Sequence, residues 1–171
     1  PADIFMKWSV EEKEAIGIYE VVFDNSNFKD EKWYINTNQS FAFADGTVTA
    51  SYGTATPKEH VDRNGTDKDG VELNPVVVIE GLKTNLIRDL KTNVANELAK
   101  TDWYITRNTE KSTAIPSAIS THRDAVRTKQ ANMETAITNA ADTAALETLH
   151  TYTTTDGVQS RPLGELPVLE S

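Results

Sequence analysis

Hydrophobic residues recur at helical spacing in the second half of the chain. From Leu82 most apolar positions are four residues apart, and Ile87, next to Leu86, is three residues before Leu90. This spacing places them on one face of a helix of about 20 residues and predicts an amphipathic helix. The residues of this stripe are Leu82, Leu86, Ile87, Leu90, Val94 and Leu98.

A second apolar stripe follows Pro116, a residue that suits the first turn of a helix. Residues 101–107 either continue the first helix or begin it again, and residues 108–113 are the expected linker. Asp142 is the expected N-cap of a short third helix with Leu146 and Leu149. Two long helices joined by a short polar linker predict an antiparallel helical hairpin. The second stripe consists of Ile119, His122, Val126, Met133 and Ile137.

The first half alternates short apolar runs with turn-forming residues. Ser9 and Glu12 have capping-box spacing, so a short helix is expected after Ser9, with Gly17 as its stop. The Asp45-Gly46 pair predicts a tight hairpin turn, because aspartate and glycine tolerate the positive φ angles that such turns require. The expected strands are residues 18–23, 32–36, 41–43, 47–52 and 75–80, and the loop from 59 to 74 is polar.

These patterns predict an α+β fold in three parts. Residues 1–80 form a small β-rich N-terminal domain, residues 81–150 a helical domain, and residues 151–171 an extended tail in which Pro162 and Pro167 break regular structure. Whether the first two parts share one core is left open by the sequence.

The charge of −9 argues against nucleic acid as the main partner, because phosphate binding needs a basic face. The charge is uneven: residues 1–75 hold fourteen acidic and seven basic side chains, whereas residues 76–150 hold nine of each. No apolar stretch reaches the length of about 20 residues that spans a bilayer, so membrane insertion is not expected. The first five residues lack the basic and apolar regions of a secretory signal.

Candidate chemistry is sparse. The chain has no cysteine, and His60, His122 and His150 have no partner at metal-ligand spacing. His122 is best explained as a packed residue of the second helical stripe. The acidic loop 62–70 fails the spacing of a calcium loop, because placing Gly70 at the obligatory glycine puts Gly65 at the first ligand position. No nucleotide or nucleophile motif is present. We therefore expect no metal, no cofactor and no enzymatic activity.

Aromatic residues give the first candidates for protein contact. Trp33-Tyr34 and Trp103-Tyr104 are tandem pairs, and exposed tryptophan and tyrosine often anchor interfaces. The alternative, in which these rings are covered within the chain, is equally compatible with the sequence.

The tail offers a second set of candidates. Residues 157–169 have no periodicity with which to fold alone, so either the chain's own domain or a neighbour must hold them. We predict a neighbour, contacted by Leu163, Leu166, Val168 and Leu169.

Two segments resemble a known group of proteins. Residues 8–21 read W-x-x-E-E-x-x-x-x-G-I-Y-x-V, similar to the opening of small proteins encoded among bacteriophage tail and tail-fibre genes. Residues 98–107 read L-x-x-T-D-W-Y-x-x-R and are followed by Ile115-Pro116 and by Arg123 and Arg127. This second block resembles one in tail-fibre assembly proteins and other tail-region proteins, where a tyrosine stands at the position of His122.

The resemblance implies a phage tail protein without enzymatic activity. We expect a structural subunit of a tail, baseplate or fibre, made in the bacterial cytoplasm, present in the virion, and associated with other tail proteins or its own copies. Two alternatives remain: a transient tail-fibre assembly chaperone, and a module that binds host-surface carbohydrate through Trp33, Tyr34 and Tyr52. Within the second block, we expect Arg107 to pair with Asp102 or Asp124 and fix the corner between the helices.

Overall fold

A computed structural model describes residues 7–169 and divides the chain into two units, Pro1–Pro57 and Lys58–Ser171. The division lies at Pro57 and not near residue 80. Residues 58–60 belong with the helices because Glu59 and His60 accept backbone hydrogen bonds from the first turn of the long helix α3. The expectations for residues 1–5 lie outside the described residues.

The first unit begins with the short helix α2, Val10–Glu14. Ser9 caps it as predicted: its hydroxyl accepts from the Glu12 backbone, and the Glu12 carboxylate accepts from the Ser9 backbone. Gly17 follows with a φ of +81°, and this left-handed residue turns the chain toward the sheet.

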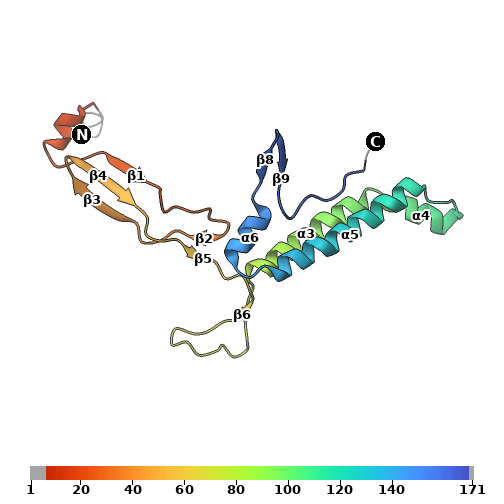
Figure 1. Cartoon of the computed structure of the whole chain (residues 1–171). Coiled ribbons are helices and arrows are strands. Elements are labelled where there is room, and N and C mark those ends of the chain that lie inside the picture. Colours follow the sequence, from red (N-terminus) through yellow and green to blue (C-terminus); the bar gives the residue numbers. More distant parts are fainter. Residues whose placement is uncertain (1–6, 170–171) are drawn as a thin grey trace. The chain divides into compact units, whose positions relative to one another are not determined.

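A three-stranded sheet with the strand order β1-β4-β3 dominates the first unit (Figure 1). Strands β3, Ser40–Ala44, and β4, Thr47–Ser51, form the predicted hairpin, with positive φ at Asp45 and Gly46. Strand β1, Val21–Asp24, pairs in parallel with β4, which the sequence did not indicate. Strand β1 also starts three residues later than the expected strand.

Strand β2, Tyr34–Ile35, pairs antiparallel with β5, Thr56–Pro57. Trp33 and Tyr34 are buried here, with 3% and 5% of their surfaces exposed. The amino groups of Lys32 and Lys29 lie over the rings of Trp33 and Tyr34, respectively. Both rings are therefore covered within the chain.

The second unit is built on two long helices, α3, Leu82–Ala99, and α5, Ser117–Asn139. They lie side by side and run in opposite directions (Figure 1): Lys83 near the start of α3 donates to Thr138 near the end of α5, and Arg123 donates to Leu98 at the other end. Except for Arg123, their buried residues fall on the predicted stripes: Leu90, Val94, Ile119, His122, Val126, Met133 and Ile137.

The short helix α4, Asp102–Lys111, follows α3 after a break at Lys100 and Thr101. The chain therefore restarts a helix at Asp102, and α4 occupies most of the segment expected to be linker. It ends at Ser112, whose left-handed φ of 52° redirects the chain toward Pro116.

Helix α6, Thr143–His150, is capped by Asp142 as predicted, through its carboxylate and the Ala145 backbone. The strands β8, Thr153–Thr155, and β9, Val158–Ser160, then form a second hairpin around Asp156-Gly157, where an irregular tail was expected.

A two-stranded ribbon connects the start of the unit to α3. Strand β6, Arg63–Asn64, pairs antiparallel with β7, Val78–Ile79, and Thr66 and Glu72 form a further bridge. At the tip, the Asp67 carboxylate accepts the backbone N–H groups of Asp69 and Val71. This carboxylate therefore stabilises the turn at the tip of the ribbon.

Gly81 and Asp62 join the base of the ribbon to α3. Gly81 is the N-cap residue of α3, and its N–H donates to the Asp62 carboxylate at 2.8 Å. The Thr84 hydroxyl donates to the same oxygen at 2.7 Å. A Cβ atom added at Gly81 would lie 2.4 Å from the Val61 carbonyl group, so no side chain fits there without a backbone shift.

Candidate interaction site

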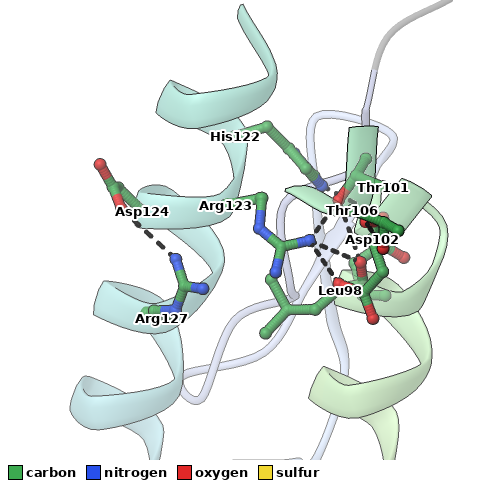
Figure 2. Close-up of polar contacts among 9 residues, drawn as sticks. Leu98, Thr101, Asp102, Thr106, His122, Arg123, Asp124 and Arg127 are labelled. Atoms are coloured by element: carbon green, nitrogen blue, oxygen red, sulfur yellow. Dashed lines mark hydrogen bonds and ion pairs between the residues drawn. The ribbon is translucent and has the colours of Figure 1, made fainter. Parts of the chain in front are cut away.

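Polar side chains from α3, α4 and α5 meet at the corner between α3 and α4 (Figure 2). Arg123 reaches from α5 into this corner, and its Nη1 atom donates to three acceptors. These are the Leu98 carbonyl at 2.8 Å, the Thr101 hydroxyl at 2.7 Å and the Asp102 carboxylate at 2.8 Å. One charged side chain thus holds the end of α3 and the start of α4 together.

Two side chains, those of Thr101 and Arg123, donate to the Leu98 carbonyl near the end of α3. Thr101 is 1% exposed. Its hydroxyl donates to the Leu98 carbonyl at 3.0 Å and accepts from Arg123 at 2.7 Å. Buried polar groups are stabilised only when they are hydrogen-bonded. Arg123 therefore adds a charged donor at the break between the two helices, where the Thr101 hydroxyl and the Leu98 carbonyl already bond each other.

A second set of charges surrounds the corner. His122 Nε2 lies 3.3 Å from Glu97 Oε1, and Lys100 pairs with the other oxygen of Glu97. The ion pair with Lys100 is the main reason why the pKa of Glu97 is lowered, and His122 contributes less. Glu97 and Lys100 lie on α3 and its C-cap, and His122 lies on α5, so these contacts also tie the two helices.

The ion pairs correct the expectation for Arg107. Asp102 pairs with Arg123, and Asp124 lies 3.5 Å from Arg127 on the exposed side of α5 (Figure 2). Arg107 instead lies over the Trp103 ring, with its Cζ atom 5.6 Å from the ring centroid. Arg107 and Trp103 are four residues apart on α4 and therefore share one helical face.

Trp103 is the exposed feature of this corner. Its surface is 52% exposed, and its ring centroid lies 4.1 Å from that of the half-buried Tyr104. The structure therefore brings together three of the residues proposed as contact points, Trp103, Tyr104 and Arg107. We call these three residues the Trp103 surface.

The other candidate residues are not part of this surface. Trp33 and Tyr34 are buried in the first unit, which corrects their proposed role as exposed anchors. Leu163 is 5% exposed, and its N–H donates to the Leu149 carbonyl at 3.0 Å, so it is held by its own unit.

The rest of the tail also lies against its own unit. Leu166 and Leu169 are half-buried, whereas Val168 is 75% exposed. Leu166 lines a hollow with Leu90 of α3 and Met133 of α5. Arg161 pairs with Glu165, which also accepts from the Tyr152 hydroxyl. The tail thus follows the alternative in which its own domain holds it.

Within residues 7–169, no three histidine, cysteine, aspartate or glutamate side chains are placed to hold a metal ion together. In the same part of the chain, every helix is too short or too polar to cross a bilayer.

Sequence reasoning placed Arg123 in the resembling block but missed its role. The available signal was Thr101-Asp102 at a helix restart, where a threonine and an acid leave acceptors for a basic residue.

Comparison of the chain with protein-family models, with curated proteins and with solved structures found no match.

Proposed function

We propose that this protein is a structural subunit of a bacteriophage tail and that it acts by protein–protein contact. The contact role is supported by one observation above others: Trp103 is half exposed on a corner that Arg123 fixes in place. The location in a phage tail is supported by the resemblance of residues 8–21 and 98–127 to tail-region proteins.

The Trp103 surface has the composition of an interface anchor. Tryptophan, tyrosine and arginine are the residue types most enriched among side chains that dominate binding energy. Arg107 and Tyr104 restrict the Trp103 ring before any partner arrives, since both lie against it. Such preorganisation lowers the entropy lost on binding.

The carbohydrate-binding alternative lacks its platform. It requires Trp33 and Tyr34 to present open ring faces to a sugar, but both are buried and lysine amino groups lie over their rings. We do not retain this alternative.

Mass spectrometry of purified phage particles tests the tail assignment. A structural subunit is expected in the particles in constant proportion to the other tail proteins. Its absence from particles, combined with its presence in infected cells, would contradict the assignment and favour the transient assembly chaperone.

The Trp103→Ala variant tests the contact surface. We expect this variant to fold normally and to enter particles at a strongly reduced level. Val158→Ala is the matched control, because Val158 is an apolar residue of the same unit with 67% of its surface exposed, on strand β9. Equal incorporation of both variants would show that Trp103 is not an anchor.

A further inference from the structure

One face of the sheet in the first unit is apolar and only partly covered by the described residues: Ala50 is buried and Tyr19 lies against Phe43, but the three phenylalanines stay largely exposed. Paired residues on neighbouring strands, and residues two apart on one strand, lie on the same face. The registers place Val21, Phe23, Val48, Ala50, Phe41 and Phe43 on this face, and none of them is charged. Phe23, Phe41 and Phe43 are 62%, 64% and 58% exposed.

Strand β3 forms one edge of this sheet. Within the described part of the chain, β3 is hydrogen-bonded to β4 on one side only, and all five of its residues are exposed. Natural edge strands are usually protected from pairing by charged side chains, proline or a bulge. The β3 sequence Ser-Phe-Ala-Phe-Ala contains no charged residue and no proline, whereas the opposite edge strand β1 contains Asp24.

We infer that the free edge of β3 pairs with β3 of a second copy of this chain, antiparallel and about a two-fold axis through Ala42. The two three-stranded sheets then form one sheet of six strands.

The near-palindrome of β3 is the reason for choosing a second copy as the partner. In this register Ala42 faces Ala42, and Phe41 of each copy faces Phe43 of the other. Directly opposite residues share a face, so the two Phe41–Phe43 pairs extend the apolar face across the new boundary. Outside the strand, Asp45 faces Gln39, so this register brings no like charges together although each chain carries a charge of −9.

The short boundary between the two strands limits the affinity of the dimer. Five paired residues on each strand form a short boundary, far below the total area of roughly 1,600 Å² typical of stable complexes. We therefore expect a reversible dimer that depends on protein concentration. The dimer closes on itself, because each copy offers β3 once.

Cysteine cross-linking of the full chain tests the register, and the absence of natural cysteines makes the readout unambiguous. In the Ala42→Cys variant, the two introduced thiols face each other at a Cα separation of roughly 5 Å, within disulfide range. Ala44→Cys is the matched control on the same strand and face, where the thiols are roughly 14 Å apart. We expect oxidation to give a covalent dimer with the first variant only. Equal cross-linking of both variants, or of neither, overturns the proposal.

Analytical ultracentrifugation gives an independent test. The Phe41→Lys variant is expected to raise the dissociation constant roughly tenfold or more, because it removes two aromatic pairs per dimer. Val22→Lys is the control, because Val22 is 54% exposed on the opposite face of the sheet. A natural chain that stays monomeric at all concentrations overturns the proposal. Should circular dichroism show that Phe41→Lys does not fold, the cross-linking result decides alone.

The inference does not rest on the phage-tail proposal. A cross-linked dimer that is absent from particles would contradict the tail assignment and leave the β3 pairing standing. A monomer found in particles would do the reverse.

Discussion

The guanidinium group of Arg123 donates to the hydroxyl of Thr101 at 2.7 Å, across the space between α5 and the corner where α3 ends. Thr101 is buried, and the Arg123 side chain is 10% exposed. This hydrogen bond links two residues that are 22 positions apart in the sequence. Together with the contacts to Leu98 and Asp102, it ties α5 to the corner where α4 follows α3.

Removing this link is expected to destabilise the second unit. Arg123→Ala leaves Thr101 and the Leu98 carbonyl without a charged donor, at a loss of about 2–3 kcal/mol in the free energy of unfolding. The loss of the Asp102 contact adds little to this value, because the Asp102 side chain is 61% exposed and water can hydrate it once Arg123 is removed. Chemical denaturation measures the effect.

Arg127→Ala is the matched control for Arg123→Ala. Arg127 lies one turn later on α5, and its contact with Asp124 is exposed and 3.5 Å long. We expect a loss below about 0.5 kcal/mol. Similar losses for both variants would contradict the assigned role of Arg123.

Trp103 should matter little for folding. With 52% of its surface exposed, Trp103→Ala is expected to lower the free energy of unfolding by about 1 kcal/mol or less, mainly through the lost contact with Tyr104. Leu146→Ala, at a position with 0% exposure, should lower it by about 2–5 kcal/mol. A large loss for Trp103→Ala would place the ring in the core and remove it as a contact candidate.

Asp62 should make the stability of α3 depend on pH. The Gly81 N–H, and after it the Thr84 hydroxyl, lower the pKa of Asp62 below its ordinary value of 3.8. A carboxylate with a lowered pKa stabilises the fold above that ordinary value, and this stabilisation is lost as the pH falls through the folded-state pKa.

The Asp62→Asn variant isolates this effect. It should melt at a lower temperature than the natural chain at neutral pH, and the difference should shrink below pH 3.8. Asp69→Asn serves as the control, because Asp69 lies at the exposed tip of the ribbon beside Lys68. A melting difference for Asp62→Asn that is constant with pH would show that the charge of Asp62 does not stabilise the start of α3.

The tail should resist proteolysis in the isolated monomer. Leu163 is buried and hydrogen-bonded to Leu149, so Leu163→Ala is expected to lower the free energy of unfolding by about 2–4 kcal/mol and to speed tail cleavage. Val168→Ala, at a position with 75% exposure, should change neither quantity measurably. Rapid cleavage of the natural tail would instead support the original expectation that a neighbour holds it.

The sequence predicted those features that depend on residues close together in the chain. Helical spacing found the buried stripes of α3 and α5, and Ser9 and Asp142 were recognised as caps because capping involves residues two or three positions apart. The Asp45-Gly46 turn was found in the same way. The hairpin at Asp156-Gly157 carries the same signal but lies in a threonine-rich segment that was read as irregular.

Contacts between residues far apart in the chain could not be predicted from the sequence. The parallel pairing of β1 with β4 joins segments separated by two other strands, and no spacing rule indicates it. The candidate site shows the same limit: the sequence supplied Asp102, Arg107 and Arg123, but it did not show which arginine meets Asp102. The three-dimensional path of α5 decides that choice in favour of Arg123.

Gly81 restricts the order in which substitutions can accumulate in this chain during evolution. Its backbone passes so close to Val61 that even a methyl group is excluded, and the same residue donates to Asp62. A substitution at position 81 is thus acceptable only after the neighbouring segment has already shifted or lengthened. A change in the length or path of the ribbon must therefore come before a replacement of Gly81 in evolution.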